Sequence, residues 1–175
     1  VYMRTMDPTY DWDSKVRLGY RNQEQYVDSA VALSGPIVED QLAFRVSGQY
    51  LDGKTLNKGI EYDGHAPDFD LNGIETYRVR SKLLWEPEAL PGFKAMLGYV
   101  TSREQGDTGR ESFEGDNPWD YVPITQRNMD TKADTVSLNL GYQLNPDMSL
   151  DMLVYHMNYD WGFDSYEANE AAEQQ

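Results

Sequence analysis

The sequence predicts an all-β fold in which consecutive strands form an antiparallel up-and-down meander. Through most of the 175-residue chain, hydrophobic residues recur at every second position, which is the pattern of a β-strand with one apolar face. Helical spacing of apolar residues is not sustained over a useful length. Short segments rich in Gly, Pro, Asn and Asp separate the alternating stretches, so we expect successive strands to pair with each other.

The first three strands follow one another closely. The first two are predicted over 12–22 and 26–35, where Val, Leu and Tyr alternate with polar residues. The second strand stops at the turn-forming pair Gly35-Pro36. The third strand, 41–51, resumes the alternation after that turn.

Four further strands complete the predicted meander. The fourth covers 76–86 and alternates apolar residues with Arg and Lys, and the fifth covers 93–103. The sixth covers 134–144 and is followed by the turn residues Asn, Pro and Asp. The seventh, 149–161, is ambiguous because both of its faces carry apolar residues. Either of two sets fits the apolar side of the sheet: Leu150, Met152 and Val154, or Leu153, Tyr155 and Met157.

The predicted connections differ in length between the two ends of the sheet. The turns after the second, fourth and sixth strands are short. The connections over 52–75 and 104–133 are long and polar, and the tail, 162–175, is predicted to begin another long polar loop. Because alternate connections of a meander lie at the same end, we expect tight turns at one end and long loops at the other.

Sorting the strand residues by parity predicts two faces of different character. The face that contains Phe44, Leu83, Leu97 and Leu138 has no charged residue in the first six strands. The opposite face is polar, and nearly all its charged residues are basic. Its basic residues include Arg17, Arg21, Arg45, Arg78, Arg80, Lys82 and Lys94.

Aromatic residues on the apolar face favour a membrane protein. They are predicted at two heights, near the long loops (Tyr50, Tyr77 and Tyr99) and near the tight turns (Trp85, Phe93 and Tyr142). Two aromatic levels that enclose aliphatic residues are typical of the interfacial girdles of a transmembrane β-barrel. We therefore predict that the meander forms part of such a barrel, in contact with outer-membrane lipid. The alternative is a soluble β-sandwich that buries the apolar face as its core.

Composition excludes several classes of function. The chain has 15 Lys and Arg against 30 Asp and Glu, so its net charge is -15 and we expect no binding to nucleic acid. The absence of Cys excludes disulfides and thiolate metal sites. No phosphate-binding loop or nucleophile motif occurs, and His65 and His156 are isolated, so we expect neither an enzyme nor a cofactor. We also expect no signal peptide and no membrane helix in this sequence.

Three segments resemble TonB-dependent outer-membrane receptors. The similarity to the second and third barrel strands of that family lies in SGPIVEDQLAFRVSGQYLDG, residues 34–53. Residues 78–87, RVRSKLLWEP, resemble the next barrel strand of the family. Residues 2–22, YMRTMDPTYDWDSKVRLGYRN, resemble the family's exit from the plug domain into the first barrel strand. The resemblance covers residues 1 to about 103 in the expected order.

The resemblance implies a fold, a location and a function. Residues 1–11 correspond to the exit from the plug, 12–161 to about the first seven strands of a larger barrel, and 162–175 to the start of a loop. It implies energised uptake of a scarce solute, such as a siderophore, vitamin or oligosaccharide, across the outer membrane of a Gram-negative bacterium. The implied partner is the TonB energy-transducing protein, acting through a plug. A passive porin-like channel and a soluble carbohydrate-binding or adhesion module are the alternatives.

The resemblance also suggests a role for the basic face. In the family this face lines the lumen, so its Arg and Lys side chains would pair with carboxylates of the plug. The alternatives are that they pair with acidic residues on neighbouring strands or are solvated in a wet lumen.

Two loop segments are weaker candidates for ligand binding. One is a ligand-contacting loop in which exposed aromatic rings stand among carboxylates, at Asp116, Trp119, Asp120 and Tyr121. The same loop residues equally fit packing onto neighbouring loops. The other resembles the opening of a calcium-binding loop, with Asp68, Asp70 and Asn72 at alternate positions. Val79 occupies the position where such a loop needs Glu, which favours an Asx-rich turn instead.

Overall fold

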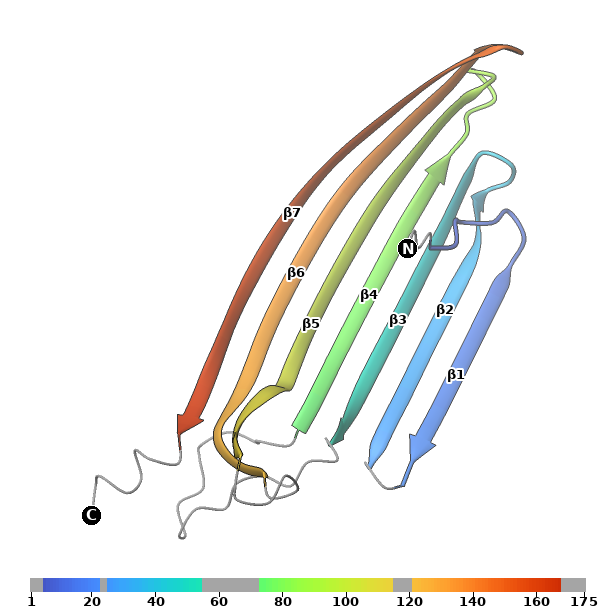
Figure 1. The fold of residues 1–175 in the computed structure, drawn as a ribbon. Helices are drawn as coiled ribbons and strands as arrows, with labels where there is room; N and C mark the ends of the chain where they lie inside the picture. Colours follow the sequence, from blue (N-terminus) through green and yellow to red (C-terminus); the bar gives the residue numbers. More distant parts are fainter. Residues whose placement is uncertain (1–4, 23–24, 55–72, 115–120, 168–175) are drawn as a thin grey trace.

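The computed structural model describes residues 5–22, 25–54, 73–114 and 121–167, with the backbone alone over 107–114, 121–128 and 164–167 (Figure 1). The described residues form a 7-stranded sheet in which every strand pairs antiparallel with its neighbours in the chain. The predicted all-β meander is therefore confirmed. The strands are β1 (Asp13–Arg21), β2 (Tyr26–Val38), β3 (Leu42–Lys54), β4 (Gly73–Trp85), β5 (Phe93–Glu114), β6 (Tyr121–Asn145) and β7 (Met148–Glu167).

The last three strands are much longer than predicted. The expected loop over 104–133 is largely a hairpin, because β5 continues to Glu114 and β6 begins at Tyr121. The expected polar tail from 162 also begins as strand, since β7 runs to Glu167. These extensions have polar residues on both faces, so they lack the apolar alternation from which strands are predicted.

The turn between β2 and β3 is also shorter than predicted. The sequence predicted a turn over 36–40, but β2 continues to Val38, and Pro36 pairs with Ala43 beside a β-bulge. A proline fits a strand at such an irregularity because it donates no hydrogen bond to the ladder. The chain reverses at Asp40, which has a φ of 54°.

The tight turns gather at one end of the sheet. In Figure 1 the turns that follow β2, β4 and β6 lie at the upper end, while β1, β3, β5 and β7 all run toward the lower end. The segment that precedes β1 starts near the upper half of the sheet and crosses the strands there (Figure 1). No helix in the described part of the chain is long and apolar enough to cross a membrane.

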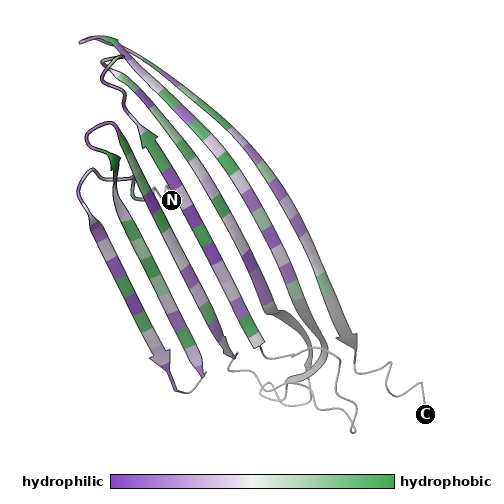
Figure 2. Ribbon diagram, turned by 180° about the vertical axis from the view of Figure 1, so that it is seen from behind, coloured by the Kyte–Doolittle hydropathy of each residue, from purple (hydrophilic) through white to green (hydrophobic). Residues whose placement is uncertain are grey.

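The strand register aligns the apolar residues in rows. Phe44 lies opposite Leu83, Leu83 opposite Leu97, and Leu97 opposite Leu138. Figure 2 shows the resulting alternation of hydrophobic and hydrophilic residues along the strands. None of these four side chains is buried, and Leu97 is 47% exposed. No second layer of the described residues covers the apolar face.

The few buried side chains lie on the opposite, polar face. Among the described residues, the buried hydrophobic side chains are Ala43, 0% exposed, and Leu84, 4% exposed. Ala43 and Leu84 face each other one row away from Arg45 and Lys82, on the polar side. Within the described ranges, the small core therefore belongs to the polar face, where the N-terminal segment lies.

Candidate functional site

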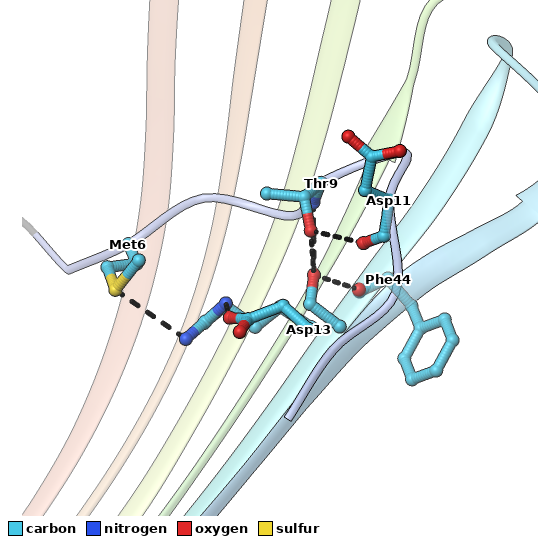
Figure 3. A network of polar contacts seen from close by, with 7 residues as sticks. Met6, Thr9, Asp11, Asp13 and Phe44 are labelled. Atoms are coloured by element: carbon cyan, nitrogen blue, oxygen red, sulfur yellow. Dashed lines mark hydrogen bonds and ion pairs between the residues drawn. The ribbon is translucent and has the colours of Figure 1, made fainter. Parts of the chain in front are cut away.

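The N-terminal segment, residues 5–11, lies across the polar face, and we refer to it as the strap. An ion pair joins it to β4, with 2.8 Å between Asp7 Oδ1 and Lys82 Nζ. Lys82 Nζ also donates a hydrogen bond to the Thr5 carbonyl at 3.1 Å. On β3, the Arg45 guanidinium donates to Met6 Sδ at 3.6 Å (Figure 3). The strap is thus held by two of the basic side chains predicted to line a lumen.

A fully buried serine fixes the middle of the strap. The Thr9 backbone N–H donates a 3.0 Å hydrogen bond to Ser34 Oγ on β2. The Ser34 hydroxyl in turn donates to the Phe44 carbonyl at 2.9 Å, and the Thr9 hydroxyl donates to the Asp11 carbonyl at 2.8 Å (Figure 3). Because each of these buried polar groups has a hydrogen-bond partner, this part of the strap packs on the sheet without leaving a polar group unsatisfied.

The end of the strap is anchored at the tight turns. The Tyr10 hydroxyl donates to Glu86 Oε2 at 2.8 Å. Burial, together with the hydrogen bond and negative charge of Glu86, raises the pKa of Tyr10 to about 12. Trp12, which follows the strap, lies on the opposite, apolar face, where it packs edge-on against Phe44 with 5.9 Å between ring centroids. Gly35 makes room for the indole, since a Cβ there would lie 2.5 Å from Trp12 Cε3.

The other predicted lumen residues lie on the same face and have mostly local partners. Arg17 pairs with Asp28 on β2 at 2.9 Å, and Arg78 pairs with Glu104 on β5 at 2.8 Å. These contacts follow the interpretation that neighbouring strands supply the acids. The remaining contacts are Arg45 with Asp13 at 3.2 Å, Lys94 with Glu86 at 3.4 Å, and Arg21 over the Tyr26 ring at 5.4 Å.

Arg80 differs from these residues. In the part of the chain that the structure describes, no carboxylate pairs with its guanidinium. Arg80 lines two adjoining hollows beside the strap, of about 320 and 360 Å³. The first is also lined by Met6 and Arg45, and the second extends across the sheet to Ser137 and Asn139. An uncompensated guanidinium in a partly enclosed hollow is suited to an anionic group.

The register of β7 resolves the ambiguity of the seventh strand. Leu138 faces Val154 and Leu140 faces Met152, so these two β7 residues lie on the apolar face with Leu150. The other candidate set lies on the polar face. There it continues into an exposed stripe made of Leu153, Tyr155, Met157, Tyr159, Trp161 and Phe163, which we call the aromatic track.

The predicted aromatic girdles enclose the uncharged part of the apolar face, which we call the band. They are arranged differently at its two ends. At the tight turns, Trp85, Phe93 and Tyr142 are contiguous, with ring centroids 5.8 and 6.5 Å apart. At the other end, Tyr50 lies opposite Tyr77. Tyr99 does not share their row, because it lies four residues before Arg103, the residue opposite Tyr77.

The position of Tyr99 reflects a slanted border of the uncharged band. On β3 and β4 the first charged residues beyond the band are Asp52 and Glu75, which face each other one row further from the tight turns than Tyr50 and Tyr77. On β5 the Tyr99 hydroxyl already donates to Asp134 of β6, at 2.9 Å. The lower border therefore moves toward the tight turns from β4 to β6.

The upper border of the band slants in the same direction. Leu42 and Trp85 share a row with Ala95, whereas Phe93 and Tyr142 lie two residues further along. The shift is about one residue per strand. The rise is about 3.3 Å per residue, and neighbouring strands are about 4.8 Å apart. If the band runs level around a barrel, a shift of one residue per strand therefore means that the strands tilt by roughly 35° from the barrel axis.

Sequence reasoning missed an ion-pair cluster just beyond the lower border. Arg103 forms a two-point contact with Asp130, at 2.9 and 2.7 Å, and Lys132 lies 3.7 Å from the same carboxylate. The cluster was missed because Asp130 and Lys132 fall in a segment predicted as loop. The alternation of opposite charges over 130–134 is the signal that indicates paired strands there.

The two loop candidates are largely outside the described residues. Asp116, Trp119 and Asp120 lie outside them, as do Asp68, Asp70 and Asn72. Tyr121 begins β6, and only its backbone is described. Within the described ranges, no group of three or more His, Asp or Glu side chains is arranged to hold a metal ion.

Comparison with known proteins adds no assignment. No protein-family model matches the chain, and no solved structure matches it.

Proposed function

We propose that this chain forms part of the wall of an outer-membrane β-barrel that takes up a scarce solute, in the manner of TonB-dependent receptors. The observation that carries the proposal is the uncharged, slanted band on the exposed face of the sheet. The polar face with its strap is the lumen side in this proposal, and the apolar face contacts lipid.

Exposure of the apolar face supports a lipid environment. A soluble sandwich buries its apolar face, because each Å² of apolar surface left in water costs about 25 cal/mol. Here Val16, Leu18, Val31, Leu97 and Val136 are all exposed, while the buried side chains lie under the strap. An apolar surface of this extent on a protein marks a contact with another protein or a membrane.

The dimensions of the band support the membrane over a protein partner. From Leu42 to Tyr50 the band extends about 26 Å along β3. At a strand tilt of roughly 35° this is about 22 Å in height, close to the apolar band of about 25 Å on outer-membrane barrels. The strand tilt inferred from the slant also agrees with the tilt of about 35–45° found in such barrels. A protein partner imposes neither a uniform height nor this slant.

The strap supports the assignment of the lumen. It precedes β1 and lies on the polar face near the tight turns, where a chain leaving a plug domain would join the barrel wall. We propose that Arg80 receives a carboxylate of that plug, because it has no acidic partner among the described residues and lines both hollows beside the strap. The TonB protein would supply the energy by pulling on the plug.

Incorporation into lipid vesicles tests the proposed function. The protein that contains residues 1–175 should float with vesicles, migrate on gels in a heat-modifiable form and require detergent in solution. A protein that remains monodisperse without detergent and does not float with vesicles would contradict the proposal and favour the soluble module.

Reversing the charge of Arg80 tests the plug contact separately. Arg80→Glu should weaken plug retention, measured as the urea concentration at which the plug becomes accessible to protease. Arg17→Glu is the control, since Arg17 is exposed, whereas Arg80 is half-buried, and Arg17 pairs within the sheet. Equal retention in the two variants would dispose of the Arg80 contact without affecting the membrane assignment.

A further inference from the structure

The lumen side of the sheet is divided into two halves of different chemistry. Over β1 to β4 it is basic and partly covered by the strap. From Met129 to Gly141 on β6 and from Leu153 to Phe163 on β7 it is uncharged and carries the aromatic track, whereas Asp151 lies on the same face nearer the tight turns. We infer that the aromatic track is a binding surface for an uncharged saccharide chain. This inference rests on the proposed function, because the track must line an open lumen.

The aromatic rings provide a platform of the required kind. Tyr159 and Trp161 are 61% and 52% exposed, so their faces are accessible. Alternate residues of one strand are about 6.6 Å apart, which spaces successive side chains at a distance comparable to one sugar ring. Trp161 and Phe163 are also in contact, with 5.4 Å between their centroids. A large ring with an apolar face and a polar edge matches the C–H face and hydroxyl rim of a sugar.

The neighbouring strand provides uncharged hydrogen-bonding groups. On the same face of β6, Thr131 lies opposite Trp161, Ser137 opposite Tyr155, and Asn139 opposite Leu153. Hydroxyl and amide groups both donate and accept, as the hydroxyls of a sugar do. Thr131 Oγ1 is buried and has no hydrogen-bond partner among the described residues, so the accessible polar groups are those of Ser137 and Asn139. Ser137 and Asn139 also line the hollow of about 360 Å³, so the track borders an open space.

Charge selects the class of ligand. From Met129 to Gly141 on β6 and from Leu153 to Phe163 on β7, the lumen-facing positions carry no charged residue. This neutrality is unusual in a chain with a net charge of -15. Within this stretch neither an anionic nor a cationic ligand meets an opposite charge, and the charged residues Asp7, Arg80 and Lys82 line the far side of the adjoining hollow. A neutral polyhydroxylated chain matches both the lack of charge and the alternation of rings and hydroxyls.

The test is calorimetric titration of the protein, in detergent micelles, with neutral oligosaccharides. Maltodextrin, xylo-oligosaccharide and manno-oligosaccharide serve as probes, with oligogalacturonate as the charged comparison. At least one neutral probe should bind, and Trp161→Ala should weaken it about tenfold or more, the loss of one stacking contact. Trp161→Phe should restore part of the affinity. Asn158→Ala, on the outer face of the same strand, is the matched control and should leave binding unchanged.

Three results would overturn the inference. They are binding by none of the neutral probes, binding that Trp161→Ala does not weaken, and a Trp161 shielded from an aqueous quencher, which would show that protein covers the track. The same samples are assayed for vesicle incorporation. A protein that inserts but does not bind contradicts the saccharide track alone, whereas a protein that does not insert contradicts the proposed membrane function.

Discussion

At the residue scale, Ser34 is the fully buried side chain that holds the middle of the strap. Its Oγ accepts from the Thr9 N–H and donates to the Phe44 carbonyl, and it is fully buried. Ser34→Ala leaves the Thr9 N–H unpaired, at a cost of about 1–3 kcal/mol. Chymotrypsin should then cleave after Tyr10 about tenfold faster or more. Ser29→Ala removes a hydroxyl from the other face of the same strand, where it donates a long, 3.4 Å hydrogen bond to the Tyr50 carbonyl and does not contact the strap, so this variant should cleave at the parent rate.

Tyr10 makes the docking of the strap sensitive to alkaline pH. Its pKa is raised from 10.0 to about 12, first by burial and then by Glu86, so the neutral hydroxyl is the form that docks. The Tyr10 hydrogen bond therefore stabilises the strap fully below about pH 10 and is lost as the pH rises through about 12. The ultraviolet tyrosinate titration of the parent minus that of Tyr10→Phe should show one group titrating near 12. A difference curve centred near 10 would contradict the docked geometry.

The partners of the basic residues illustrate what a sequence cannot supply. Parity correctly placed Arg45 and Lys82 on one face, because side chains alternate along a strand. It left open whether their acids come from a plug or from neighbouring strands. Lys82 pairs with Asp7, which precedes the sheet, and no local periodicity links residues so far apart in the chain.

At the scale of elements, the contact between β2 and Trp12, which joins the strap to β1, requires glycine at position 35. A Cβ there would lie 2.5 Å from Trp12 Cε3, so Gly35→Ala must displace the indole. We expect a loss of about 1–3 kcal/mol in unfolding free energy, measured by denaturant titration in micelles. Gly48→Ala is the control, since its nearest neighbour, Val31 Cγ1, is 3.9 Å away. Equal stability of both variants would contradict the packing of Trp12.

Prediction of the elements from the sequence succeeded where one face is apolar. The central alternation of β3 and β4 was sufficient to place those strands within a few residues. It did not predict the ends of β5, β6 and β7, where cross-strand charge pairs such as Arg103 with Asp130 replace the apolar pattern. The faces of β7 became clear only from its register against β6, because both of its parities are apolar.

At the scale of the whole molecule, the membrane assignment predicts opposite effects at adjacent positions. Leu138 and Asn139 are neighbours on β6 but face opposite sides of the sheet. Leu138→Arg places a charge on the lipid face near the middle of the band and should cost about 2–4 kcal/mol of stability in lipid vesicles. Asn139→Arg should cost under about 1 kcal/mol, since a lumen position tolerates charge. Equal costs would contradict the orientation of the sheet.

The most direct test of lipid contact is a spin-label scan along β6 in lipid vesicles. The chain has no Cys, so single substitutions from Thr135 to Tyr142 can each be labelled cleanly. We expect labels at Val136, Leu138 and Leu140 to be relaxed by oxygen, which dissolves in lipid, and those at the intervening positions by a water-soluble nickel chelate. Labels at those three positions that are shielded from both reagents would show that protein covers this face, and would contradict the account.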